Sequence, residues 1–165
     1  MKIVKFAFAL LALGHAVVHA DGGLGSKPVL SLALAKRMAD ACEASATSAG
    51  WRPVNIAIFD DGGNLKLFRR QDNAYLHSIQ IAKMKAHTAA GLPRSTRALG
   101  DIAYANPERP HGIQYVDGFA TFPGGLPILT AKGVQLGGIG VSGATADQDE
   151  QCAQAGLDAI AEALK

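Results

Sequence analysis

Histidine is the side chain in this sequence best suited to bind a metal or to exchange a proton near neutral pH. Three histidines follow residue 20, namely His77, His87 and His111. His77 and His87 fall in a predicted helix, on roughly one side but about three turns apart, which is too far for both to bind one ion. His111 lies in an irregular loop, 106–117, from which a side chain can swing toward a ligand. For each of them, a solvated or hydrogen-bonded side chain is the alternative interpretation.

A glycine-rich stretch near the C-terminal end is the second candidate for chemistry. Residues 134–141 read as a strand and residues 140–144 as a tight turn before a helix. Backbone N–H groups of such a turn suit a carboxylate or phosphate. Three acids in the first helical turn, Asp147, Asp149 and Glu150, weaken that site because they repel an anion. The alternative is that the glycines allow close packing of a neighbouring element.

Motifs of familiar enzyme classes do not appear in the sequence. It contains no nucleophile elbow, no phosphate-binding P-loop, no metalloprotease helix and no evident Cys–His pairing. Four aspartates are available as acid and base if folding brings two of them together: Asp60, Asp72, Asp147 and Asp149. Spacing along the chain cannot reveal such a pair, so the sequence names no catalytic residue.

The elements that position these residues follow from apolar periodicity and from turn signals. The first helix is expected to start at Leu30 and to end at Gly50. Further helices are expected over about 75–90, 95–103 and 147–164. Strands are expected over 54–59, 65–68, 119–122, 127–129 and 134–141. Thr145 and Gln148 have the spacing of a capping box at the start of the last helix. This order predicts an α+β fold, a three-layer α/β/α sandwich around an antiparallel five-stranded sheet.

The first 20 residues have the layout of a secretion signal. Lys2 and Lys5 precede an apolar run at 6–13, and 18–20 (VHA) supplies small residues for cleavage after Ala20. The apolar run is too short to span a membrane. We therefore expect an exported protein, periplasmic or secreted. Its expected parts are a signal peptide at 1–20, a flexible leader at 21–27 and a single domain at 28–165.

Removal of the signal changes the charge of the chain. The full sequence has 16 Lys and Arg against 14 Asp and Glu, and loss of Lys2 and Lys5 leaves 14 against 14. The mature protein is therefore close to neutral, and it shows no basic stripe or aromatic platform for nucleic acid. We expect no nucleic-acid partner and no membrane span.

Two cysteines, Cys42 and Cys152, lie on the first and last predicted helices. In an exported chain a disulfide between them is one interpretation, provided that the two helices pack side by side. Two buried thiols acting as small apolar side chains are the other. A metal site built on these two residues is not expected, because no further ligands have suitable spacing.

Two blocks of the sequence resemble one family. The first, at 124–156, reads GGLPILTAKGVQLGGIGVSGATADQDEQCAQAG. The second combines GGNLKLFRRQDNA at 62–74 with SIQIAKMKAHTA at 78–89. In order and spacing they are similar to the GlcG/HbpS family of haem-binding proteins, whose domain also occurs at the C-terminus of PduO-type corrinoid adenosyltransferases. The resemblance implies a profilin-like α/β/α layering, a symmetric homo-oligomer and a tetrapyrrole ligand. The adenosyltransferase activity belongs to a separate domain that this sequence lacks.

A haem site needs an apolar slot, an axial ligand for iron and partners for the propionates. His111 is the first choice of ligand and His77 the second, while Met84, Tyr104 and Tyr115 remain open. The candidate propionate partners are Arg69, Arg70, Lys83 and Lys85. The complete set of candidate cofactor-binding residues is His111, His77, His87, Lys83, Phe122, Gly124, Gly125, Pro127, Gly140, Ser142 and Gly143.

The sequence leaves three functions open. The first is an exported haem-binding protein without turnover of its own. The second is an accessory protein or enzyme acting on a small hydroxy acid or related carboxylate, suggested by the association of the name GlcG with glycolate use. The third is a structural oligomer that presents a face to a partner protein.

Overall fold

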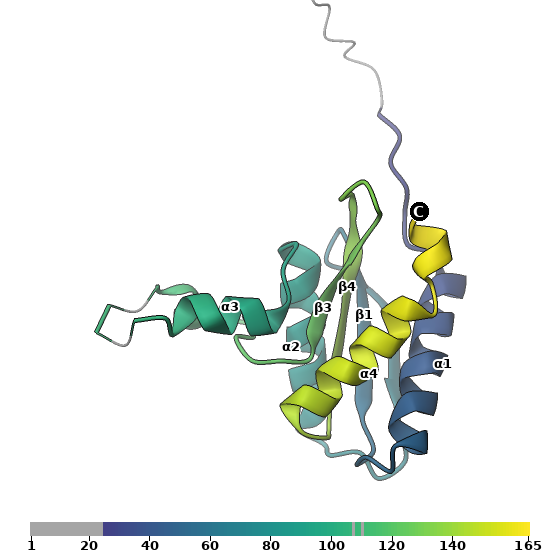
Figure 1. Ribbon diagram of the computed structural model, residues 1–165, viewed down its shortest axis with the longest axis horizontal. Coiled ribbons are helices and arrows are strands. Elements are labelled where there is room, and N and C mark those ends of the chain that lie inside the picture. Colours follow the sequence, from purple (N-terminus) through teal and green to yellow (C-terminus); the bar gives the residue numbers. More distant parts are fainter. Residues whose placement is uncertain (1–24, 107, 110) are drawn as a thin grey trace, which may run out of the picture.

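The computed structural model describes residues 25–106, 108–109 and 111–165. The expected signal peptide, 1–20, lies outside the described residues, as do residues 21–24 of the expected leader. The strands form one antiparallel sheet, and helices cover both of its faces (Figure 1). This arrangement confirms the α+β class.

The sheet has four strands in the described part of the chain, with the order β2-β1-β4-β3. They are β1 (Asn55–Asp60), β2 (Leu65–Arg70), β3 (Gly125–Leu129) and β4 (Gln135–Ser142). The expectation of five strands is wrong, because 119–122 forms no strand. The reason lies in its hydrogen bonding, since the N–H of Ala120 donates to the side chain of Thr88 instead of to a neighbouring strand.

The larger core lies between the sheet and two helices, α1 (Leu32–Ser48) and α4 (Ala146–Asp158). Because side chains alternate along a strand, Ile56 and Ile58 of β1 point to this face together with Ile139 and Val141 of β4. A disulfide joins Cys42 of α1 to Cys152 of α4, and both side chains are fully buried. The two helices therefore pack side by side, as the disulfide interpretation required.

In the described part of the chain, α2 (Ser78–Gly91) covers the opposite face of the sheet. Its inner side is almost entirely small, with Ala82 and Ala86 against Ala57 of β1. Small residues let the backbone of α2 come close to the sheet. Several longer side chains of α2, among them Gln80, Lys83 and Met84, lie at its margin, where they line a surface hollow.

A short helix, α3 (Thr96–Ala103), and the segment after it project from the body of the molecule (Figure 1). Ser95 caps α3 by accepting a hydrogen bond from the N–H of Ala98, as its residue type predicts. The capping box of Thr145 and Gln148 is likewise confirmed at the start of α4. The last helix ends earlier than expected, at Asp158, and a 3-10 turn, η2 (Ala161–Leu164), follows it.

Candidate functional site

The cleft with the strongest binding chemistry lies along the outer margin of α2. Its volume is about 370 Å³, near the lower end of the roughly 300–1,000 Å³ typical of small-molecule sites. It is lined by Phe59, Gln80, Lys83, Met84, His87 and Gly118. Four of these residues come from α2 at spacings of three and four, so the helical period places them on one face. We call this the α2 cleft.

His87 supplies the metal-binding group of the α2 cleft. Its ring packs edge-to-face on Phe59 of β1, with centroids 5.4 Å apart and an interplanar angle of 82°. The turn of the β1–β2 hairpin also comes close, because a Cβ added to Gly63 would lie 3.3 Å from Nε2 of His87. The imidazole is therefore oriented by packing and still exposed to solvent. Met84, one turn earlier, adds a thioether to the same cleft.

Lys83 adds a positive charge to the α2 cleft. Its Nζ lies 5.1 Å from the centroid of the Phe68 ring, a cation–π contact. The cleft thus combines aromatic and thioether surface, an imidazole and one ammonium group. These are the requirements for a flat, largely apolar ligand that carries an acidic group.

The other two histidines do not join His87. His77 precedes α2 and is exposed, and His111 is exposed in the segment before η1 (Ile113–Tyr115). Neither residue lines any of the three hollows described in this section. Among the described residues, no cluster of three or more His, Cys, Asp or Glu could hold a metal ion.

The glycine turn that was expected to shape a pocket is tightly packed. A Cβ on Gly140 would lie less than 3.0 Å from the backbone of Ala82 and Ala86 on α2. A Cβ on Gly143 would meet the backbone of Pro53 equally closely. The N–H of Ala144 is already taken by Oδ1 of Asp149, at 3.0 Å. These glycines therefore serve close packing, the alternative that the sequence left open.

Next to this turn lies a buried ion pair between α2 and α4. Nζ of Lys85 is 2.9 Å from Oδ2 of Asp149 and 2.8 Å from the carbonyl oxygen of Val141. The two side chains are 1% and 4% exposed. Burial lowers the pKa of Lys85 and raises the pKa of Asp149, while each charge partly opposes the shift of the other.

The pair also explains two further candidate residues. A Cβ on Gly124 would lie less than 3.0 Å from Nζ of Lys85, and the ring of Phe122 lies 5.1 Å from the same atom. Sequence reasoning assigned Lys85 to the propionates and missed its burial. One signal was available, because Lys85 follows Ala82 by three residues and precedes Ala89 by four, on the buried side of α2.

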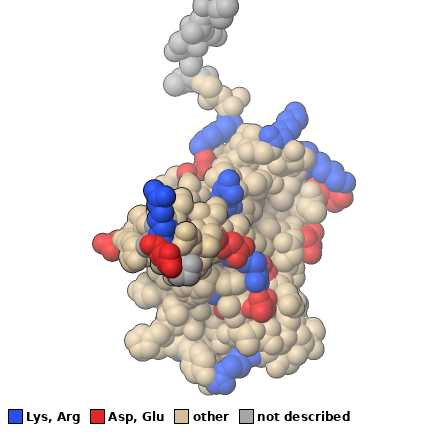
Figure 2. Space-filling model, turned by 60° about the vertical axis from the view of Figure 1, so that its left-hand side comes forward, with Lys and Arg blue, Asp and Glu red and all other residues tan. Residues whose placement is uncertain are grey.

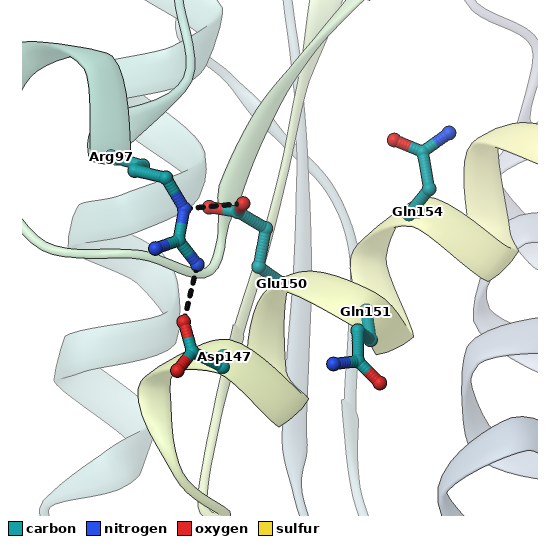
Figure 3. Close-up of a pocket in the computed structure, with 5 residues that line it drawn as sticks. All are labelled: Arg97, Asp147, Glu150, Gln151 and Gln154. Atoms are coloured by element: carbon teal, nitrogen blue, oxygen red, sulfur yellow. Dashed lines mark hydrogen bonds and ion pairs between the residues drawn. The ribbon is translucent and has the colours of Figure 1, made fainter.

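Two further hollows are both lined by Arg97 of α3. The first, of about 510 Å³, is lined by Arg97 and by Asp147, Glu150, Gln151 and Gln154 of α4, as Figure 3 shows. Arg97 bridges both acids, at 2.5 Å to Asp147 and 2.8 Å to Glu150, and these hydrogen bonds raise the pKa of its guanidinium. Its charge is thus already neutralised by protein carboxylates.

The second hollow has a volume of about 440 Å³. It is lined by Arg97 together with Gly100, Asp101, Tyr104, Thr121, Phe122 and Pro123. On the face shown in Figure 2, acidic and basic side chains are interspersed, and neither sign forms a continuous patch.

The remaining candidates have structural partners. Arg69 pairs with Asp40 and Glu43 of α1, and Arg70 donates to the carbonyl of Ala74. Other candidates lie within the sheet, where Gly125 and Pro127 of β3 face Gly140 and Gly138 of β4, and Ser142 faces Asn55.

The four aspartates do not assemble into an acid–base pair. Asp60 accepts hydrogen bonds from the backbone of Asn64 and Gly62 in the hairpin turn, and these bonds lower its pKa. Asp147 and Asp149 pair with the cations described above, and Asp72 is exposed.

No helix of the described chain is long and apolar enough to cross a membrane.

Comparison with known proteins gives the chain its relatives. An uncharacterized 15.0 kDa protein of Citrobacter freundii is 36% identical over 135 residues, covering 81% of this chain and 93% of that protein. Corrinoid adenosyltransferase PduO of Salmonella typhimurium is 31% identical over 109 residues, which are 66% of this chain but 32% of PduO. The match to PduO therefore covers about a third of that enzyme.

Solved structures agree with the sequence matches. The crystal structure of HbpS superposes with a TM-score of 0.75 at 34% identity, covering 84% of this chain and 95% of that one. The crystal structure of a PduOC:heme complex superposes with a TM-score of 0.72 at 28% identity, covering 81% and 96%. The family model described as "Haem degrading protein HbpS-like" matches residues 30–158. This chain therefore belongs to the HbpS-like family, as its two sequence blocks indicated.

Proposed function

We propose that this protein is exported and binds haem, or a closely similar tetrapyrrole, in the α2 cleft. The observation that carries the proposal is the convergence of an imidazole, an aromatic wall and an ammonium group on one hollow. The PduOC:heme complex, which shares the fold, makes a tetrapyrrole the first ligand to test. Export rests on the layout of residues 1–20.

The residues of the α2 cleft fit the parts of a haem. His87 is the proposed axial ligand, because a neutral imidazole nitrogen is a common iron ligand and this ring is held by Phe59. Met84 is the alternative ligand from the same face of α2. Lys83 is the proposed propionate partner, since its ammonium group can leave the Phe68 ring and bind a carboxylate instead.

The size of the α2 cleft limits how the ligand is held. A hollow of about 370 Å³ covers only part of a tetrapyrrole, so the rest of the ring faces solvent or a second copy of the chain. A second copy is favoured by the apolar side chains that the projecting segment leaves exposed, namely Tyr104, Tyr115, Val116 and Phe122. We therefore propose a homo-oligomer.

The proposed role is ligand binding without turnover of its own. The alternative function, action on a small hydroxy acid, called for a pair of carboxylates or an anion-binding turn. Asp60 and Asp149 are engaged in structural hydrogen bonds, and the glycine turn is filled by packing. We therefore do not adopt the alternative.

The test is a hemin titration of the purified protein and of three histidine variants. The wild type should give a saturable Soret band, and His87→Ala should lose or shift that band. His77→Ala and His111→Ala are matched controls, because each removes an exposed imidazole outside the cleft, and both should bind as the wild type does. Lys83→Gln should weaken binding roughly 3- to 10-fold, as expected for one partly exposed charged hydrogen bond.

The outcomes separate the parts of the proposal. A wild type that produces no Soret band refutes haem binding. A wild-type spectrum in His87→Ala, together with loss of the band in His111→Ala, moves the ligand to the loop and refutes the α2 cleft. Light scattering at micromolar concentration tests the oligomer, and a strict monomer contradicts it.

A further inference from the structure

One wall of the α2 cleft is a loop segment that belongs to no helix or strand. Gly118 forms this wall, facing the side chains of α2 across the hollow. A loop needs specific contacts to hold a fixed position, because it lacks the repeated hydrogen bonds of a strand. The contacts of this segment therefore decide the width of the cleft.

The hydroxyl of Thr88 provides two of those contacts. Thr88 follows His87 directly on α2 and is 1% exposed. Its Oγ1 accepts a hydrogen bond from the N–H of Ala120 at 2.9 Å and donates to the carbonyl of Gly118 at 3.3 Å. One buried side chain thus ties the wall to the helix that carries the proposed ligand.

The other side of the same segment is closed by α3. A Cβ on Gly100 would lie less than 3.0 Å from the carbonyl oxygen of Thr121, so α3 and the segment are in backbone contact. The segment can therefore move away from α2 only if Thr88 releases it and α3 moves with it.

We propose that Thr88 positions the Gly118 wall relative to His87 and thereby sets the affinity of the α2 cleft for its ligand. This inference rests on the proposed function and adds a residue that does not line the cleft. Loss of the hydroxyl leaves the Ala120 N–H and the Gly118 carbonyl without this partner. Both groups regain partners if the segment and α3 move outward together and water reaches the two groups, and that movement widens the cleft.

The chain contains a matched control for Thr88. Thr96, the first residue of α3, is also fully buried, and its Oγ1 accepts from the N–H of Gly125 at 2.9 Å. It holds the start of β3 in the same way, yet it lines none of the three hollows. Thr88→Val and Thr96→Val therefore make the same chemical change in a buried threonine, with only the first next to the cleft.

The first experiment needs no ligand. Amide hydrogen exchange at Ala120 should be at least 10-fold faster in Thr88→Val than in the wild type, and close to wild type in Thr88→Ser, which keeps the hydroxyl. Thr96→Val should leave exchange at Ala120 unchanged. Unchanged exchange in Thr88→Val overturns the positional role, whatever the protein binds.

The second experiment measures hemin dissociation, with thermal unfolding of every variant as a control for stability. Thr88→Val should bind hemin at least 10-fold more weakly and release it faster, with an unaltered Soret position because His87 is retained. Thr88→Ser and Thr96→Val should stay within about threefold of the wild type. Equal weakening by Thr96→Val overturns the proposal, because a general loss of stability then explains both effects. A wild type that binds no hemin refutes the proposed function, and the exchange result still decides the position of the wall.

Discussion

The buried pair of Lys85 and Asp149 gives the sharpest prediction for stability. Lys85→Met removes the ammonium group and leaves the carboxylate of Asp149 buried with backbone donors such as the Ala144 N–H. Removing one partner of a buried ion pair typically costs about 3–5 kcal/mol. We therefore expect each single variant, Lys85→Met or Asp149→Asn, to be destabilised by this amount.

A buried group that is left without its partner can gain or lose a proton, and this limits how much free energy of unfolding each single variant loses. A lone buried carboxyl can become neutral, and protonating a carboxyl of ordinary pKa 3.8 at pH 7 costs about 4 kcal/mol. A lone buried lysine can also become neutral, and deprotonating a lysine of ordinary pKa 10.5 at pH 7 costs about 5 kcal/mol. Larger losses would require the surrounding structure to change.

The double variant Lys85→Met/Asp149→Asn distinguishes pairing from packing. It removes both charges and keeps an oxygen that can accept from the Ala144 N–H. It should be less destabilised than either single variant, because no uncompensated charge remains. Urea unfolding monitored by circular dichroism gives the four free energies. Additive single effects, within about 0.5 kcal/mol, would refute the reasoning.

The same pair predicts how stability depends on pH. Burial raises the pKa of Asp149, so the folded state holds this proton more tightly than the unfolded chain does. Stability should therefore fall as the pH rises from about 4 through the raised pKa. Burial lowers the pKa of Lys85, so stability should rise again as the pH rises from that lowered value toward 10.5. The fall and the rise of stability with pH should both be absent from the double variant.

Three further predictions concern other parts of the fold. Cys42→Ser/Cys152→Ser should lower the free energy of unfolding by about 4–5 kcal/mol, the chain-entropy value for a loop of about 100 residues. If a reductant leaves the urea unfolding of the wild type unchanged, this prediction is contradicted. Gly140→Ala should cost roughly 1–3 kcal/mol, since its Cβ would press on the backbone of α2, and an unchanged urea midpoint contradicts the packing role. Asp60→Asn should be less stable than the wild type at neutral pH, because hydrogen bonds to the Asp60 carboxylate lower its pKa and stabilise the folded state. This difference in the free energy of unfolding should shrink as the pH falls below 3.8 and the carboxylate becomes protonated. A difference that is constant with pH contradicts the prediction.

Local features of the fold could be predicted because a few neighbouring residues encode them. Ser95 and Thr145 cap their helices through hydrogen bonds that span three residues. The turn at 61–64 joins β1 to β2, and Asp60 closes it over a similar span. The two sequence blocks that indicated the family also lie within the matched region.

The candidate site was harder to predict because its decisive contacts link distant parts of the chain. Nothing near His87 in the sequence shows that Phe59 and Gly118 will border it, and His111 looked better placed in its loop. The segment 119–122 has the composition of a strand, yet its backbone is bound by Thr88, 32 residues from Ala120.

The caps, the hairpin, most of the helices and strands, and the family could all be inferred from the sequence. Each of these depends on backbone preferences and hydrogen bonds within one or two turns. Three further features could be seen only in the folded chain: the glycines serve packing, Lys85 is buried and His87 faces a cleft. Those outcomes depend on which surfaces meet, because burial and electrostatic environment arise from contacts between residues far apart in the chain.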